Sequence, residues 1–153
     1  MWRLATESDC NAIVSMCMAL NADDPGPAPV QPEDVTRTLI TLWREPYRGR
    51  AVVCDINGHA VAYALLIPFW SNELGGEVCT VDELYVGPEY RGRGLATRLF
   101  ERLVDEEQSL WSGTPVALAL EVTPQNERAR ALYEHLGFRG KNIAMRRPLS
   151  NVK

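Results

Sequence analysis

A glycine-rich turn decides how this sequence folds. It reads Val86-Gly87-Pro88-Glu89-Tyr90-Arg91-Gly92-Arg93-Gly94-Leu95-Ala96. An apolar stretch precedes it and a helical pattern follows it, so it joins a strand to a helix. Gly92 and Gly94 allow the backbone to turn tightly and to approach a ligand closely. The first amides of the following helix have no intrahelical acceptors and lie at the positive end of the helix dipole. The turn therefore predicts a site for phosphate groups.

The glycine turn has other interpretations. Gly-x-Gly alone is equally compatible with a simple strand-to-helix turn. A dinucleotide-binding fold would want a further glycine three positions after Gly94, where Thr97 stands, and would usually place the turn after the first strand. A P-loop needs Gly-Lys-Ser/Thr, which the turn lacks. The turn therefore matches neither of these nucleotide-binding motifs. Residues elsewhere in the chain support a phosphate site of another kind.

The segments around the turn resemble one known family. Arg91-Gly92-Arg93-Gly94-Leu95-Ala96 is similar to the pattern Arg/Gln-x-x-Gly-x-Gly/Ala, the pyrophosphate-binding signature of the GNAT family of N-acetyltransferases. The preceding Leu84-Tyr85-Val86-x-Pro88-x-Tyr90 also resembles that family. So does the later Asn126-x-x-Ala129-x-x-Leu132-Tyr133-x-x-Leu136-Gly137-Phe138. Two motifs in the expected order, each on the expected element, make the resemblance specific over nearly the whole chain.

The resemblance implies a single acetyltransferase domain over residues 1–153 that takes acetyl-CoA as co-substrate and acetylates a primary amine. Because members of this family are often dimers, the resemblance also suggests a homodimer. The cofactor-binding positions that it implies are Leu84, Tyr85, Val86, Arg91, Gly92, Arg93, Gly94, Leu95, Ala96, Asn126, Ala129 and Tyr133.

Hydrophobic periodicity predicts the order β-α-α-β-β-β-α-β-α-β. The expected strands cover residues 2–5, 51–56, 60–69, 78–86, 116–122 and 138–145. The expected helices cover about 12–20, 32–43, 94–111 and 126–136. Asn57-Gly58 indicates a two-residue hairpin turn, and the continuous apolar run 116–122 indicates a strand buried on both faces. We expect an α/β fold with a central mixed, mostly antiparallel sheet flanked by about four helices.

The second motif carries a candidate acid. Asn126, Ala129 and Tyr133 are spaced three and then four residues apart, so on a helix they share a face. Taken alone, Tyr133 is better explained as a core aromatic beside Leu132 and Leu136. The resemblance implies that Tyr133 protonates the departing thiolate of coenzyme A and that Asn126 contacts the cofactor. A phenol with a pKa near ~10 can do so in an apolar site.

The acceptor amine requires a base. With a pKa near ~10.4, only about one amine in a thousand is neutral at physiological pH, and only the neutral form attacks a thioester. Glu83 is the favoured base and Asp82 the next, while either can equally be a surface carboxylate. Strand alternation puts the two on opposite faces, although the resemblance implies a bulge that disturbs this count. It also implies that amides around Tyr85 and Val86 hold the thioester carbonyl.

Acidic residues gather in segments expected to border the acceptor pocket. Asp23, Asp24, Trp70 and Asp82 are the candidate substrate-binding residues. Further acids in the same segments are Glu33, Asp34, Glu73, Glu77 and Glu83. Carboxylates there would attract a cation, so we expect a small cationic amine as the acceptor. The competing interpretation is that these acids only keep loops solvated.

Composition and charge limit which other classes of protein the chain can belong to. The chain has 153 residues, a net charge of −4, four cysteines and two histidines. An acidic balance disfavours nucleic acid as a partner. The scattered cysteines predict free buried thiols and no metal site. With no apolar run long enough to span a membrane and no signal-peptide pattern, a cytoplasmic location away from membranes is the default. The rival functions are a non-catalytic acetyl-CoA-binding regulatory domain, a protein N-terminal or lysine acetyltransferase, and a Rossmann-type NAD binder.

Overall fold

A computed structural model describes residues 1–105, 107, 110–140 and 142–149. The chain divides into two compact units, Met1–Glu121 and Val122–Lys153, and each is described by itself. The first unit holds a five-stranded sheet of β1 (Trp2–Leu4), β2 (Arg50–Ile56), β3 (His59–Ser71), β4 (Gly76–Val86) and β5 (Ala117–Leu120). Its helices are α1 (Cys10–Asp23), α2 (Pro32–Arg44) and α3 (Leu95–Val104). The second unit holds α4 (Glu127–His135). No described helix is long and apolar enough to cross a membrane.

The sheet follows the chain order β1-β2-β3-β4-β5. Its first three pairings are antiparallel and the last, between β4 and β5, is parallel. The expected mixed, mostly antiparallel sheet is therefore confirmed, as are four α-helices in the described part of the chain. Asn57 and Gly58 both have positive φ, 53° and 80°, as a type I′ hairpin turn requires.

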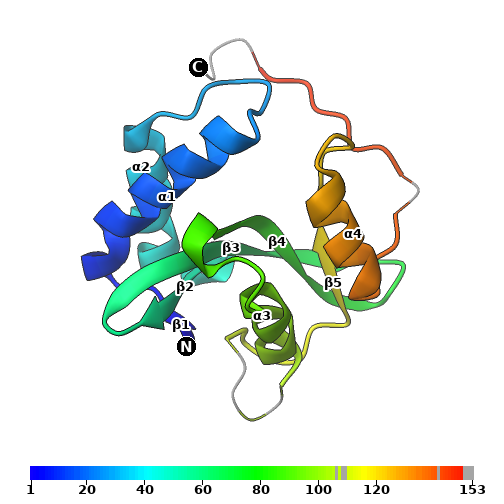
Figure 1. Cartoon of the computed structure of the whole chain (residues 1–153). Helices are drawn as coiled ribbons and strands as arrows, with labels where there is room; N and C mark the ends of the chain where they lie inside the picture. The colour runs from blue at the N-terminus through cyan, green and yellow to red at the C-terminus, as the bar shows by residue number, and fades with distance from the viewer. Residues whose placement is uncertain (106, 108–109, 141, 150–153) are drawn as a thin grey trace. The chain divides into compact units, whose positions relative to one another are not determined.

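Helices cover both faces of the sheet in the first unit. Helices α1 and α2 lie on one face and α3 lies on the other (Figure 1). The core beneath α1 and α2 joins Ile13, Leu39, Val53 and Tyr63, all of them fully buried. On the opposite face, the Trp2 indole N–H donates to the carbonyl of Leu95, at the start of α3, over 2.8 Å.

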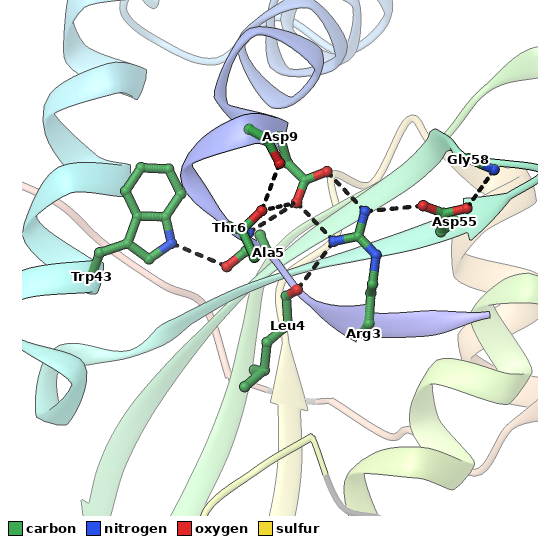
Figure 2. A network of polar contacts seen from close by, with 9 residues as sticks. Arg3, Leu4, Ala5, Thr6, Asp9, Trp43, Asp55 and Gly58 are labelled. Carbon is green, nitrogen blue, oxygen red and sulfur yellow. Dashed lines mark hydrogen bonds and ion pairs between the residues drawn. The ribbon is translucent and has the colours of Figure 1, made fainter.

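An ion-pair network fixes the N-terminal strand to the sheet and to the turn before α1. The Arg3 guanidinium donates to both oxygens of Asp9, at 2.8 and 3.0 Å, and to Asp55 at 3.0 Å (Figure 2). Asp9 also accepts the backbone N–H of Thr6, forming a capping box at the short 3₁₀ helix Glu7–Asp9. Asp55 in turn accepts the amide of Gly58 in the β2–β3 turn.

Three expectations about the second half of the chain were wrong. Helix α3 ends at Val104 instead of 111, because Asp105 is extended; residues 106 and 108–109 lie outside the described part. Leu110 and Trp111 are buried but not helical. The Trp111 indole N–H donates to the Glu77 carboxylate over 2.9 Å, which holds this segment against β4.

Residues 138–140 and 142–145 do not form the expected strand, and residue 141 lies outside the described part of the chain. Ile143 and Met145 are exposed, so in the second unit these apolar residues do not mark a buried strand. The predicted strand 116–122 forms only over Ala117–Leu120 and is half-buried, because in the first unit β5 pairs with β4 alone and is an edge strand.

Candidate active site

A β-bulge in β4 sets the direction of the candidate bases. Leu65 of β3 lies opposite Glu83, and the next residue, Leu66, lies opposite Val81, so Asp82 is the extra residue that forms the bulge. Because Leu65 and Leu66 face opposite sides of the sheet, Glu83 and Val81 do so as well, although they are two residues apart. The bulge therefore turns Glu83 toward α1 and α2, and Asp82 is exposed.

Glu83 lies in a half-buried site between β3 and α1. The Tyr63 hydroxyl donates to its Oε2 over 2.7 Å, and the Cys17 thiol donates to the same atom over 3.6 Å. Burial raises the pKa of Glu83 above its ordinary value, and the hydrogen bonds from Tyr63 and Cys17 oppose that rise. Burial also raises the pKa of the Cys17 thiol, to about 11. A carboxylate with a raised pKa is suited to accept a proton near neutral pH.

The glycine turn has the backbone conformation that its sequence predicts. Gly92 and Gly94 both lie in the left-handed region, with φ of 74° and 75°. A Cβ added at either position would meet no atom of the described structure within 4 Å, so the space beside the turn is open. The first intrahelical bond of α3 runs from the Arg98 amide to the Gly94 carbonyl. The amides of residues 95–97 precede it and are available to an anion.

Two arginines belong to the same turn. Arg91 donates from Nε to the Val86 carbonyl over 2.9 Å and pairs with Asp23 at 3.2 Å. Its guanidinium also lies 5.6 Å from the centre of the Tyr85 ring. Arg93 lies 5.3 Å from the centre of the Tyr90 ring. The turn thus combines free amides with two cations held against aromatic rings.

The strand that leads into the turn has one open edge in the first unit. Pairing between β4 and β5 ends at Val81 and Leu120, whereas β4 continues to Val86. The Gly87 amide bonds to the Val61 carbonyl on β3. Because antiparallel ladder bonds alternate, the Tyr85 N–H also points toward β3, and the N–H groups of Leu84 and Val86 point to the open edge. Of the two amides expected to face the thioester, only that of Val86 faces this edge.

The second motif lies in the second unit. Asn126 caps α4, its side-chain oxygen accepting the Ala129 amide over 3.2 Å. Tyr133 is half-buried, packs edge-to-face against Phe138 at 6.0 Å, and has a pKa raised by burial. Gly137 follows the helix with φ of 95°, the left-handed conformation expected after a helix C-terminus. Asn126 therefore has a structural role in addition to the cofactor contact that its motif implies.

The predicted acceptor residues are not all brought together. Asp23 pairs with Arg91 beside the glycine turn, and Asp24 directly follows α1. Trp70 is exposed and lies near the C-terminal end of β3. It is five residues beyond Leu65, the β3 residue opposite Glu83. That separation is about 17 Å along the strand.

Of the other acids, Glu77 binds the Trp111 indole and Asp34 pairs with Arg37 in the first turns of α2. In the described part of the chain, no cluster of three or more histidine, cysteine or acidic residues could hold a metal ion.

Tyr63 and Cys17 were missed as site residues by the sequence analysis. Tyr63 gave a partial signal, because a tyrosine in an otherwise apolar strand needs a partner for its hydroxyl. Nothing in the sequence indicated that the partner would be Glu83.

Comparisons with known proteins agree with this fold. A possible acetyltransferase from Clostridium difficile 630 superposes with a TM-score of 0.79 at 22% identity, covering 97% of this chain and 96% of that one. An aminoglycoside N-acetyltransferase in complex with CoA superposes with a TM-score of 0.73 at 14% identity, covering 98% and 94%. These likenesses show the fold.

Sequence relatives extend the comparison. An uncharacterized N-acetyltransferase of Methanocaldococcus jannaschii is 32% identical over 92 residues, 60% of this chain and 39% of that protein. The ribosomal protein bS18-alanine N-acetyltransferase of Escherichia coli K12 is 34% identical over 87 residues, 57% of this chain and 53% of that protein. Each match spans less than two thirds of the relative's own length.

The fold and the site define an α/β protein in which a strand with an open edge and a half-buried carboxylate runs into a glycine-rich turn and a helix. The acetyltransferase (GNAT) family model matches residues 14–138, most of the chain. The chain belongs to this family.

Proposed function

We propose that the protein is an acetyl-CoA-dependent N-acetyltransferase, with residues 1–153 acting as one domain. The observation that carries the proposal is the continuity of β4: the strand holds a half-buried carboxylate at Glu83 and runs directly into the glycine turn. The family membership agrees with it. A regulatory domain that only binds acetyl-CoA would need the turn but no buried base.

The first unit offers separate groups for the two parts of acetyl-CoA. The first-turn amides of α3, with Arg91 and Arg93, suit the phosphates. The open edge of β4, with the Leu84 and Val86 amides, suits the acyl-bearing arm as an added strand-like partner. Val86 N–H is then the donor for the thioester oxygen as negative charge develops on it.

The chemistry follows by direct attack in a ternary complex. Glu83 takes one proton from the acceptor ammonium, directly or through a water, which leaves a neutral amine. The amine nitrogen forms a bond to the acetyl carbon, and the bond from that carbon to sulfur breaks. Tyr133 donates its hydroxyl proton to the departing thiolate and recovers a proton from the nitrogen, which has become an amide. The products are the acetylated amine, coenzyme A and one proton on Glu83.

A thiol-release assay tests the enzyme against the regulatory alternative. Coenzyme A release, followed with DTNB over a panel of amines, should be fast for the wild type. Glu83→Gln should lower kcat/KM by ~100- to 10,000-fold, the range of general acid–base steps. Binding of acetyl-CoA with no turnover of any amine would support the regulatory domain.

We propose a small cationic amine as the acceptor. Its support is the net charge of −4 and the exposure of Asp82 next to Glu83. Attraction between an acidic surface and a cation weakens over a Debye length of ~10 Å at 0.1 M salt. The value of kcat/KM for a cationic amine should therefore fall as salt rises, while that for a neutral amine stays constant. A preference for neutral or anionic amines without salt dependence would contradict the acceptor class and leave acetyl transfer intact.

A protein N-terminus is the second candidate acceptor. Its support is the 34% identity to a ribosomal protein-alanine N-acetyltransferase over 57% of the chain. An alanine-starting peptide in the same assay tests it. A kcat/KM for the peptide well above that of every small amine would replace the small-molecule acceptor.

Size-exclusion chromatography with light scattering tests the homodimer that the family resemblance suggests.

A further inference from the structure

The two hydrogen bonds to Glu83 both end on one oxygen. Tyr63 and Cys17 donate to Oε2, at 2.7 and 3.6 Å. Among the described residues, no protein group bonds to Oε1. The side chain is half-buried, while Tyr63 is fully buried and Cys17 is 3% exposed, so the two donors lie behind the carboxylate.

We propose that Tyr63 and Cys17 are positioning residues that hold Glu83 by Oε2 and leave Oε1 to receive the proton of the acceptor amine. The inference rests on the proposed role of Glu83 as the base. Because Oε2 already accepts two donors, a proton added to the carboxylate goes to Oε1. The amine, or a water that relays its proton, therefore has to approach on the Oε1 side.

The packing around Tyr63 makes it a rigid donor. Its ring is fully buried in the core under α1 and α2, and it lies 6.5 Å from the Tyr85 ring. A hydroxyl on a fixed ring holds the carboxylate in one rotamer, so less side-chain entropy remains to be lost when the amine binds. Cys17 adds a second, weaker donor from α1, which couples the helix to the base.

The same contacts set the pH range of the base. The groups that face Glu83 are Tyr63 on β3 and Cys17 on α1, and Asp82 adjoins it on β4. Tyr63 and Cys17 stabilise the charged form and oppose the rise in pKa that burial causes. Removing either donor therefore raises the pKa of Glu83. Since the base must be ionised to act, the acid limb of the kcat/KM profile moves to higher pH.

Two variants that remove a donor and two matched controls form the core of the test. Tyr63→Phe removes only the hydroxyl and Cys17→Ala removes only the thiol. Tyr47→Phe and Cys54→Ala are the matched controls: Tyr47 is exposed and bonds to Glu45, and Cys54 is buried in β2. The Glu83 carboxyl is titrated by carbon-13 NMR, with its signal assigned by its loss in Glu83→Gln. The pH profile of kcat/KM is measured in parallel.

We expect Tyr63→Phe to raise the Glu83 midpoint and the acid limb of the rate profile together by about one pH unit, and Cys17→Ala to raise both by less. The controls should match the wild type. A Glu83 midpoint unchanged in both test variants would overturn the inference. If Tyr63→Phe does not fold, Cys17→Ala is compared with Cys17→Ser, which keeps a donor. A higher Glu83 midpoint in the alanine variant alone supports the inference, and equal midpoints in the two variants overturn it.

The NMR titration separates this inference from the proposed function, because it needs no turnover. A midpoint that moves while the rate profile stays fixed would show that Glu83 is not the base, and with it the positioning role would fail. A protein that acetylates no amine while the midpoint responds as expected would overturn the acetyltransferase proposal and leave the hydrogen bonds to Glu83 established.

Discussion

The Arg91 guanidinium lies 3.2 Å from the Asp23 carboxylate, which pairs the arginine of the glycine turn with the last residue of α1, 68 positions earlier in the chain. The two side chains are 34% and 56% exposed, so the pair is weak. Asp23 thus places a negative charge beside the turn at which the phosphates of acetyl-CoA are proposed to bind. The acceptor-binding role that the sequence predicts for Asp23 stays a prediction beside this contact.

Replacing Asp23 with Asn should tighten acetyl-CoA binding. The change removes an anion that competes with phosphate for Arg91, and an exposed pair is worth at most about 1 kcal/mol, or roughly fivefold in Kd. Calorimetry with acetyl-CoA measures this, and Glu33→Gln, the same charge change on exposed α2 surface, is the control. Weaker binding in Asp23→Asn would mean that the pair orients Arg91 for the ligand.

Replacing Gly94 with Val should weaken acetyl-CoA binding severely without unfolding the protein. The position has φ of 75° and open space around it, so the substitution strains the backbone by roughly 1–2 kcal/mol and blocks the ligand's approach. Gly58→Val, at φ of 80° with equally open space in the β2–β3 turn, reproduces the strain away from the site. Calorimetry and thermal melting should show similar stability losses for both and an affinity loss for Gly94→Val alone. Unchanged affinity would remove the turn from the cofactor site.

Replacing Tyr133 with Phe should lower kcat by ~100- to 10,000-fold and leave acetyl-CoA affinity nearly constant. Burial raises the pKa of Tyr133, so its hydroxyl stays protonated, and able to act as an acid, to higher pH than an ordinary phenol near ~10. The wild-type kcat should accordingly show no alkaline decline below about pH 10 from this group. Tyr47→Phe, at an exposed position, serves as the control. A wild-type kcat in Tyr133→Phe would make Tyr133 a packing residue.

Replacing Asp9 with Asn should destabilise the fold by about 1–2 kcal/mol, because the change removes the buried negative charge and one of the two oxygens that bind Arg3. The hydrogen bond from Arg3 is the main cause that lowers the pKa of Asp9 below its ordinary value of 3.8. Its stabilisation is therefore fully present above that value and disappears as pH falls through the lowered folded-state pKa.

Denaturant unfolding at several pH values measures this effect. The difference in unfolding free energy between the wild type and Asp9→Asn should be constant from neutral pH to about pH 5 and should shrink in stronger acid. Glu134→Gln, which breaks an exposed pair with Arg130 on α4, should cost no more than about 0.5 kcal/mol. A difference that grows as pH falls would contradict the assigned ion pair.

Local backbone requirements made much of the fold predictable. Asn57-Gly58 and Gly137 were read correctly, because positive φ is a property of a few residue types and needs no distant partner. Both helices α1 and α2 followed from their apolar spacing and first-turn signals. The pattern failed after Val104, where Leu110 and Trp111 continue an apolar spacing outside a helix. Apolar spacing reports burial, and a loop that packs against β4 through Glu77 buries side chains as well as a helix does.

The sequence by itself determined the strand, glycine turn and helix that hold the proposed phosphate site, because the left-handed conformations of Gly92 and Gly94 and the free amides after them are set within a few residues. Only the tertiary structure decided which way the candidate base points. Alternation along β4 put Val81 and Glu83 on one face, and the bulge at Asp82 separated them. Register between strands sets such a bulge, and the donors to Glu83 come from β3 and α1, 20 and 66 residues away. No local pattern could specify those contacts, because packing of α1 on the sheet brings them together.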